Sequence, residues 1–476
     1  MNKLFGMALL ALLTYGCTDG SSRNGSGSDS IAEILDPASK TSPAPVNISD
    51  SLEEVLEFGK LASACAQYDA NPEDRNLMLM CGKYYFFYDG LGTPGPPLPL
   101  LQVMANELPA HVGAGFERIG GILDPYSSDN LPVGFGAAPS YGSVEAKAFT
   151  CAACHFGKTE EGIYVTGLGN FELDYGKELL YMMLVPNVIV GFEDRAGLAE
   201  KFGPEVAKSI EAVLTPLDLD AETQIRISAT INQMGIDIFT SGGEVAPFVV
   251  SDETPYFWTT WAPGVLDFFT SPFPDEGVHI PIRIPSLWEI PNSQDIKELG
   301  LRHAMLQAGG GGDSLENFVR GFIMTSGGDQ ADWSDDDIRP IVEYIYSLQH
   351  PQYTELRGAL DTEKVEAGRA LFDNEGCIDC HDGKSYGGKD IFYFGDETPN
   401  SRTLATDSTL QFFADPDQDF QICCDLTLLD GSELTHGLKA PHLTGIWAHR
   451  VFLHNGSVAS LEELLCRMVQ GLRPIP

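Results

Sequence analysis

The spacing of hydrophobic residues predicts helices in several parts of the chain. In residues 51–65, leucine and valine recur on one side of a helix. The clearest pattern follows Ser334, a capping residue that precedes three aspartates and a helically spaced apolar face, with Pro351 beyond the end. Residues 193–213 and 221–231 also have helical patterns. We therefore expect a mainly α fold.

Two stretches lack this periodicity. Residues 90–101 are dominated by glycine and proline, and residues 235–285 combine proline with many aromatic residues. Long irregular segments of this kind usually serve function or line sites. Residues 350–360 form the best domain boundary, so we expect an N-terminal domain over 51–350 and a C-terminal domain over 361–476.

The first 17 residues resemble an export signal. A short basic start precedes an apolar run over 4–13, which is too short to span a bilayer as a helix. The run ends near Cys17 in a sequence that resembles a bacterial lipoprotein cleavage box. We expect a lipid anchor at Cys17, or else simple secretion. Residues 18–50, rich in Ser, Gly, Asp and Pro, then form a flexible tether. The expected location is the periplasm or cell surface, as an outer-membrane lipoprotein.

Composition and charge narrow the range of functions. The chain has 476 residues, of which 43% are hydrophobic, too many for a disordered chain. Acidic residues outnumber basic ones by 68 to 29, and the formal net charge is −39. Such a field repels phosphate backbones, which argues against nucleic acid as a partner. The charge is typical of a solvated acidic surface; alternatively, it steers a basic redox partner.

Two motifs carry the most specific chemistry in the chain. Cys151-Ala152-Ala153-Cys154-His155 and Cys377-Ile378-Asp379-Cys380-His381 each match C-x-x-C-H, the attachment motif of c-type haem. Two thiols at this spacing reach both vinyl groups of one porphyrin, and the adjacent imidazole falls on the iron. The alternative is that two redox or zinc cysteine pairs happen to precede histidine. We predict two covalent haem c groups, with His155 and His381 as iron ligands.

Five cysteines remain after the haem motifs and Cys17. In an oxidising compartment Cys65 and Cys81 are expected to form a disulfide, and Cys466 could pair with Cys423 or Cys424. We interpret these cysteines as structural.

A helix is also predicted just before the second motif. Val365, Gly368 and Phe372 lie on one face of it. In cytochrome c folds, a glycine and an aromatic residue at this spacing let the first helix cross a later helix closely. The expected counterpart before the first motif, residues 144–149, is shorter and less regular.

The chain contains an internal repeat. Residues 300–319 align without gaps with residues 446–465, and Ser314-Leu315-Glu316 matches Ser460-Leu461-Glu462. Upstream, the Pro-x-Leu sequence at Pro285 echoes that at Pro441, with roughly ten extra residues in the first copy. This predicts a duplicated haem domain, with a large insertion at about 171–279 in the first copy.

The two copies differ at the position that could bind iron from the far side. For the second haem, His436, His442, His449 and His454 are available, of which we favour His454, with His436 next. Ala308 stands at the equivalent place in the first copy and cannot bind iron. Occupancy of this position decides between electron transfer and reaction with small oxidants. We therefore expect an open position on the first haem.

His303 is the residue that could contradict this expectation. It could be a distal ligand, a distal hydrogen-bonding group or a structural residue. The pocket of the first haem is expected to be lined by the insertion and by the loop 306–313.

These residues resemble the bacterial dihaem cytochrome c peroxidase superfamily, and within it the rubber-oxygenase-type dihaem c-type cytochromes. The resemblance is carried by Lys439-Ala440-Pro441-His442-Leu443-Thr444-Gly445-Ile446 and Phe452-Leu453-His454-Asn455-Gly456-Ser457-Val458. It implies that His454 is the second ligand of the C-terminal haem and that the haem on His155 binds oxygen. It also implies a tryptophan between the haems, either Trp288 or Trp447, and Ca2+ between the domains. The branch usually carries Trp-Asp-Gly where this chain has Ala308-Gly309-Gly310.

We therefore expect a peroxidase-like oxidoreductase that uses hydrogen peroxide or dioxygen, with Trp288 and His303 in the catalytic machinery. The alternatives are an electron carrier with two six-coordinate irons and an oxygenase of an organic substrate. Peroxide reduction also needs a proton donor. The candidates in the sequence are Glu160, Glu161, Glu172, Asp174 and His303.

Overall fold

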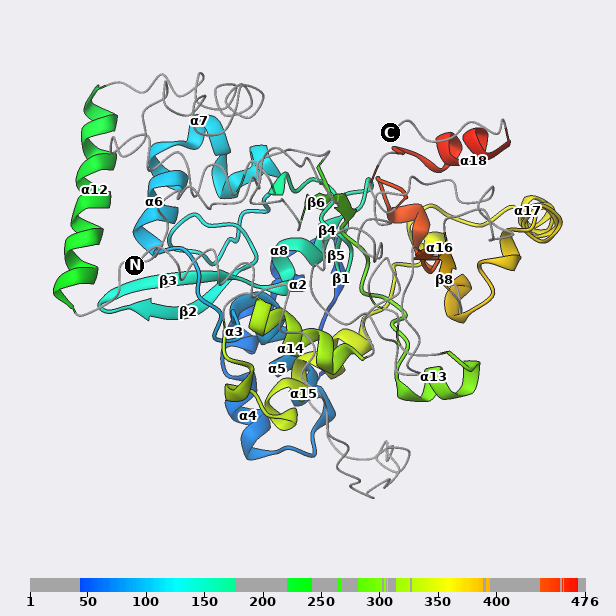
Figure 1. Ribbon diagram of the computed structural model, residues 1–476, viewed down its shortest axis with the longest axis horizontal. Coiled ribbons are helices and arrows are strands. Elements are labelled where there is room, and N and C mark those ends of the chain that lie inside the picture. The colour runs from blue at the N-terminus through cyan, green and yellow to red at the C-terminus, as the bar shows by residue number, and fades with distance from the viewer. Residues whose placement is uncertain are drawn as a thin grey trace, which may run out of the picture.

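The computed structural model describes residues 43–175, 178, 221–241, 263–267, 281–301, 304, 306, 314–325, 328–387, 391–393, 437–453, 456 and 458–469. The expected export signal, most of the tether and the helix at 193–213 lie outside this set. Within it, helices form most of the regular structure, and short strands form small sheets (Figure 1). No helix among the described residues is long and apolar enough to cross a membrane.

The N-terminal part is a group of helices: α2 (Leu52–Leu56), α3 (Phe58–Leu61), α4 (Ala64–Ala70) and α5 (Arg75–Tyr88). The single helix expected over 51–65 is therefore wrong. It breaks at Glu57, whose φ of 47° is left-handed and ends α2. The reason is tertiary, because the Glu57 carboxylate turns inward to an ion pair with Lys83 on α5. The expected disulfide Cys65–Cys81 is confirmed and joins α4 to α5.

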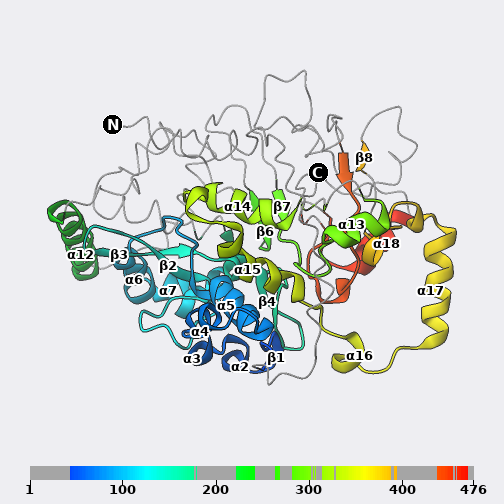
Figure 2. The ribbon, with the colours of Figure 1, turned by 90° about the horizontal axis from the view of Figure 1, so that it is seen from below.

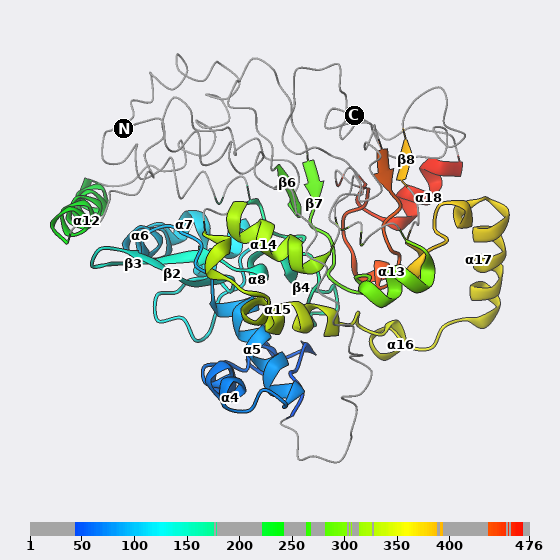
Figure 3. The same cartoon turned by 60° about the horizontal axis from the view of Figure 1, so that its bottom comes forward.

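Helix α15 (Asp335–Ser347) packs along α5. Its predicted cap is confirmed: the Ser334 hydroxyl accepts a hydrogen bond from the Asp337 backbone N–H, and the Asp337 carboxylate accepts one from the Ser334 backbone N–H. The two helices approach so closely that a Cβ on Gly82 would lie 1.9 Å from the Pro340 carbonyl oxygen. Figure 3 shows α5, α15 and α14 (Leu315–Thr325) together, close to α8 (Cys151–His155).

The close crossing corrects one expectation. Gly82 and Phe86 have the same spacing as Gly368 and Phe372, and the Phe86 ring lies 5.6 Å from that of Tyr344 on α15. The crossing helix of the first half is therefore α5, far upstream of the first haem motif. The expected counterpart, residues 144–149, is strand β3 (Val144–Phe149), which pairs with β2 (Phe135–Tyr141) and leads directly into α8.

Two of the remaining elements have bounds that differ from the expected ones. The expected loop over 90–101 ends where α6 begins at Leu98, and the helix expected over 221–231 extends further, to Thr240. Strands β1 (Ile48–Ser49), β5 (Tyr164–Thr166) and β4 (Phe156–Lys158) form an antiparallel sheet in that order. Two antiparallel pairs are formed by β6 (Val265–Asp267) with β7 (Pro281–Arg283) and by β8 (Ile391–Tyr393) with β9 (Gly437–Lys439). The further helices are α6 (Leu98–Glu107), α7 (Pro109–Val112) and α12 (Ala221–Thr240).

The C-terminal part contains α13 (Ser293–Leu299), α16 (Tyr353–Leu356), α17 (Thr362–Asn374) and α18 (Leu461–Val469). The helix predicted before Cys377 is confirmed as α17. It lies at the edge of the molecule (Figure 2), and none of its residues is buried. Leu371 is 58% exposed, and a Cβ on Gly368 would have no atom within 4 Å among the described residues. The close crossing expected at Gly368 is thus absent from this part of the chain.

Candidate functional site

The first cysteine motif forms the one-turn helix α8. Strand β3 delivers the chain to it, and Ala152 and Ala153 are buried against the core. Cys151 and Cys154 are half-buried free thiols. Burial raises the pKa of each to about 12, so both are neutral at physiological pH.

His155 ends this turn, and one hydrogen bond sets the tautomer of its ring. Its Nδ1 lies 2.9 Å from the carbonyl oxygen of Pro285, which is 130 residues away in the chain. A carbonyl oxygen can only accept, so Nδ1 carries the proton. Burial lowers the pKa of His155 to about 4, which keeps the ring neutral. Nε2 is therefore left with its lone pair, the form in which histidine binds a metal.

These residues fit the covalent haem c that C-x-x-C-H motifs attach. Two thiols outside any disulfide share a single helical turn with a neutral, oriented imidazole. The imidazole N–H bonded to a backbone carbonyl is the usual outer-shell support of a metal-ligating histidine. The sequence did not identify Pro285 as the hydrogen-bond acceptor of His155, because its only recognisable feature was its place in the internal repeat.

The second motif follows α17. Cys377 begins a short 3-10 turn, and both Cys377 and Cys380 are half-buried free thiols. Burial, and then the neighbouring Asp379 and Asp382, raise the pKa of Cys380. The His381 ring lies 6.1 Å from that of Phe372 on α17. The donor set is the same as in the first motif, and it also fits haem c.

The two Pro-x-Leu sequences dock in the same way. The backbone N–H of Leu287 donates to the carbonyl of Gly167 at 2.8 Å, and that of Leu443 donates to the carbonyl of Ser385 at 3.0 Å. Each acceptor lies a short distance after the histidine of its own cysteine motif. Four residues after each proline the backbone turns left-handed, at Glu289 (φ 55°) and at Gly445 (φ 69°).

The repeat continues into the helices that follow. Ser314 precedes α14 and Ser460 precedes α18. The Ser314 hydroxyl accepts from the Asn317 backbone N–H at 3.2 Å, and the Ser460 hydroxyl accepts from that of Glu463 at 3.0 Å. Both serines therefore cap their helices in the same manner.

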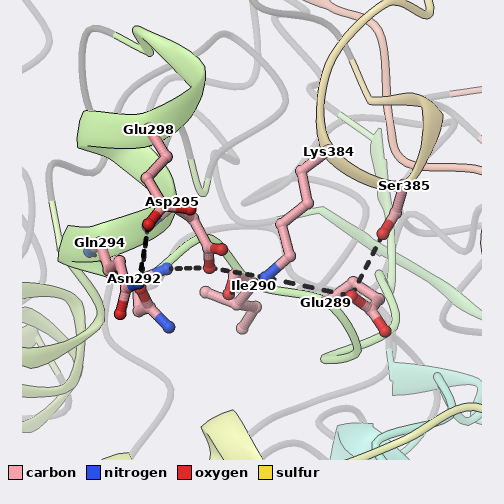
Figure 4. A network of polar contacts seen from close by, with 8 residues as sticks. All are labelled: Glu289, Ile290, Asn292, Gln294, Asp295, Glu298, Lys384 and Ser385. Carbon is pink, nitrogen blue, oxygen red and sulfur yellow. Dashed lines mark hydrogen bonds and ion pairs between the residues drawn. The ribbon is translucent and has the colours of Figure 1, made fainter. Parts of the chain in front are cut away.

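A polar network joins the first copy to the second motif (Figure 4). Lys384, three residues after His381, donates to Asp295 on α13 at 2.6 Å. Its neighbour Ser385 donates to Glu289 at 3.2 Å. Asp295 also closes the capping box of α13 by accepting from the Asn292 backbone N–H. The extra residues of the first copy, which form α13, thus contact the loop after the second motif.

Trp288 is fully buried between a segment that follows the first cysteine motif and one that follows the second. Its Nε1 donates to the Thr166 carbonyl at 3.3 Å, on the strand before Gly167. On the other side it packs so tightly on Gly445 that a Cβ there would lie 2.6 Å from the ring. Its ring centroid is 6.1 Å from that of His449. Trp288 is therefore a core residue that contacts segments belonging to both motifs. Trp447, the other candidate, is half-buried and stacks under the Arg357 guanidinium.

His449 has both ring nitrogens occupied. Arg283 donates to its Nδ1 at 2.7 Å, so its Nε2 carries the proton and donates to the Ser286 hydroxyl at 2.6 Å. Burial, and then Arg283 and His442, hold the pKa of His449 well below its ordinary value. His449 is thus a satisfied neutral core histidine in this structure.

The expected proton donors differ in their surroundings. Glu160 and Glu161 pair with Arg357, and Glu172 pairs with Arg450 at 2.5 Å. Asp174 is buried.

Glu178 was missed by sequence reasoning. Its side chain is only 3% exposed, and its Oε2 is buried without a hydrogen-bond partner among the described residues. Burial, and then Asp174, raise its pKa to about 8, so it holds a proton at neutral pH close to Cys154. The only sequence signal is its place one helical turn after Asp174.

Several expected site residues lie outside the described residues: Cys17, His303, Ala308, Cys423, Cys424, His436 and His454. Among the residues that the structure does describe, no group of three or more His, Cys, Asp or Glu side chains could hold a metal ion. The expected Ca2+ therefore has no candidate site in this part of the chain.

Comparison with known proteins relates one segment of the chain to a protein family. A family model described as RoxA-like, cytochrome c-like, matches residues 437–468, which include β9, the turn at Gly445 and most of α18. No curated protein and no solved structure matches the chain. The matched segment contains both phrases on which the sequence resemblance rested. Over this segment the chain is similar to RoxA-like cytochromes, and the similarity supports a haem c-type cytochrome.

Proposed function

We propose that this protein is an exported dihaem c-type cytochrome that acts as a peroxidase-like oxidoreductase. The first haem, on Cys151, Cys154 and His155, would receive hydrogen peroxide or dioxygen. The second, on Cys377, Cys380 and His381 with His454 as its other ligand, would relay electrons. The observation that carries the proposal is the neutral His155, oriented by Pro285 and next to two free thiols.

The second haem is supported by the repeat geometry. The same proline-based docking, the same left-handed turn and the same serine-capped helix follow both cysteine motifs. Such agreement over several independent local features is what a duplicated cytochrome c-like domain would produce.

The chain's own groups have distinct roles in this proposal. A bound haem c supplies an iron that changes oxidation state, and its free position decides what it can react with. Pro285 holds His155 in the tautomer that can ligate. Trp288 excludes water from the contact between the halves. Glu178 holds a proton at its carboxyl near Cys154, whereas Glu160 and Glu161 are held in ion pairs with Arg357.

We also propose the cellular setting that this chemistry needs. Covalent haem attachment in bacteria takes place after export, which agrees with a lipid anchor at Cys17 on the periplasmic side or cell surface. The net charge of −39 favours a basic protein as the electron-transfer partner.

The number of haems can be tested by removing each motif in the full-length protein. We expect two covalently bound haems per chain by pyridine haemochrome assay, and one in either Cys151→Ser/Cys154→Ser or Cys377→Ser/Cys380→Ser. Cys466→Ser is the control and should retain two. A wild-type protein with a single haem would contradict the proposal.

The same variants test which haem is open. Carbon monoxide should bind one haem of the reduced wild-type protein, and this binding should disappear with Cys151→Ser/Cys154→Ser but persist with Cys377→Ser/Cys380→Ser. If carbon monoxide binds neither haem, the protein is an electron carrier rather than an enzyme.

A further inference from the structure

Four tyrosine and tryptophan rings form a continuous row from the end of α5 to the start of α15. The ring centroid of Tyr88 lies 6.1 Å from that of Tyr84, which lies 6.2 Å from that of Tyr85. The centroids of Tyr85 and Trp333 are 5.9 Å apart, with the rings edge to face at 86°. Aromatic rings at these separations pack directly against one another. We call Tyr88, Tyr84, Tyr85 and Trp333 the aromatic row.

The inner end of the aromatic row reaches the first cysteine motif through Phe87. The Phe87 ring lies 6.1 Å from that of Tyr88 and 5.2 Å from that of Phe156, the residue that follows α8. The Phe87 carbonyl accepts a hydrogen bond at 3.4 Å from the hydroxyl of Thr150, the residue that precedes α8. Phe87 therefore contacts the chain at both ends of the motif to which the first haem is assigned.

The outer end of the aromatic row lies at the surface. Trp333 is only partly buried, and the aspartates around it in the chain, Asp332, Asp335 and Asp336, are all exposed. An indole in this place can lose its N–H proton to water once it has lost an electron. The negative surroundings favour a reaction partner that carries no negative charge.

The inner member of the row differs in what can happen to its proton. The Tyr88 hydroxyl oxygen is buried and has no hydrogen-bond partner among the described residues. A tyrosine that has lost an electron becomes a neutral radical only when an acceptor takes the phenol proton. Tyr88 has no such acceptor in the described part of the chain, whereas Trp333 is open to water. An electron vacancy on the row therefore settles at Trp333, at the surface.

We propose that the aromatic row carries electrons inward to the first haem, and that Trp333 is a surface oxidation site for electron-rich aromatic molecules without negative charge, such as phenols. This rests on the proposed reduction of hydrogen peroxide at the first haem. Two phenol molecules lose one electron and one proton each and become phenoxyl radicals. The two electrons pass along the row one at a time. Together with two protons from solvent, they convert one hydrogen peroxide to two water molecules, which balances the reaction.

The test treats full-length dihaem protein with one molar equivalent of hydrogen peroxide, as wild type, Trp333→Phe and Tyr85→Phe. Both replacements keep an aromatic ring in the packing but remove the group that is readily oxidised. A nitroso spin trap should form an adduct at Trp333 in the wild type, located by mass spectrometry, and this adduct should be absent from Tyr85→Phe. Peroxide-dependent oxidation of guaiacol, an uncharged phenol, should fall about tenfold in both variants, while the optical change that peroxide causes in the haem stays the same.

Tyr126→Phe is the matched control. Tyr126 is 42% exposed and connects to the same Tyr88 ring through Phe58, which lies 5.1 Å from Tyr88 and 5.2 Å from Tyr126. It does not lie between Trp333 and the first motif, so its replacement should change neither the Trp333 adduct nor guaiacol oxidation. Loss of guaiacol oxidation in Tyr126→Phe but not in Trp333→Phe would overturn the assignment of Trp333.

Two further outcomes separate the inference from the proposed function. If guaiacol oxidation in Trp333→Phe and Tyr85→Phe stays within about twofold of the wild type while peroxide still reacts with the haem, the aromatic row carries no electrons and the proposed function stands. If peroxide leaves the haem spectrum of the wild-type protein unchanged, the proposed function itself fails, and the inference fails with it.

Discussion

Replacing Gly82 with alanine is expected to lower the free energy of unfolding by about 3 kcal/mol, at the upper end of what overpacking a core usually costs. The added Cβ would lie 1.9 Å from the Pro340 carbonyl oxygen and 2.6 Å from Cβ of Tyr344. Both obstacles are backbone or first side-chain atoms, which cannot move away by changing a rotamer. Helices α5 and α15 would have to separate, and the contacts of Phe86 with Tyr344 would loosen. Chemical denaturation followed by circular dichroism measures the effect.

The matched control is the equivalent glycine of the second half. A Cβ on Gly368 meets nothing within 4 Å among the described residues. Gly368→Ala should therefore stabilise by about 0.5–1 kcal/mol, through the better helix propensity of alanine. Equal destabilisation by both substitutions would show that α17 also crosses another helix closely, as sequence reasoning expected.

The second large effect concerns the buried ion pair that breaks the first helix. Lys83→Met is expected to destabilise the protein by about 3–5 kcal/mol, because it leaves the Glu57 carboxylate buried without its cation. Lys83 is fully buried and donates to Glu57 at 2.9 Å and to the Val46 carbonyl, and the Val46 backbone N–H also donates to Glu57. The pair thus attaches the N-terminal segment, including β1, to α5.

Two further variants make this result interpretable. Lys60→Met removes the exposed partner of the same carboxylate and should cost less than about 1 kcal/mol. The double variant Glu57→Gln/Lys83→Met should be markedly more stable than Lys83→Met alone, since no charge remains buried. If Lys83→Met and Lys60→Met cost the same, the buried pair contributes no more than a surface pair.

Acid should weaken the same pair. Burial on its own would raise the Glu57 pKa, but Lys83 and the hydrogen bonds from Lys60, Lys83 and Val46 outweigh it and hold the pKa below its ordinary value. The stabilisation from Glu57 is therefore present above the ordinary pKa of glutamate and is lost as the pH falls through the lower folded value. Unfolding measured against pH should show this loss in the wild type and not in Glu57→Gln/Lys83→Met.

Features that depend on neighbouring residues were accessible from the chain alone. The cap at Ser334 and the helix before Cys377 follow from short-range spacing, and the disulfide between Cys65 and Cys81 was expected from an oxidising compartment. The structure has all three. The internal repeat was visible too, because its proline, glycine and serine signals occur in the same order in both copies. The family match over residues 437–468 covers the second copy.

Other features came only with the folded molecule, because they join residues far apart in the chain. Helix α2 ends at Glu57 because the Glu57 carboxylate forms a buried ion pair with Lys83, 26 residues later in the chain. His155 takes its tautomer from Pro285, 130 residues away, and His449 is satisfied by Arg283 from the other half. The hydrophobic periodicity of the sequence indicates which residues are buried, but not which other residues they contact in the interior. Ion pairs and hydrogen bonds in a poorly solvated interior depend on those contacts, so tertiary packing determines them.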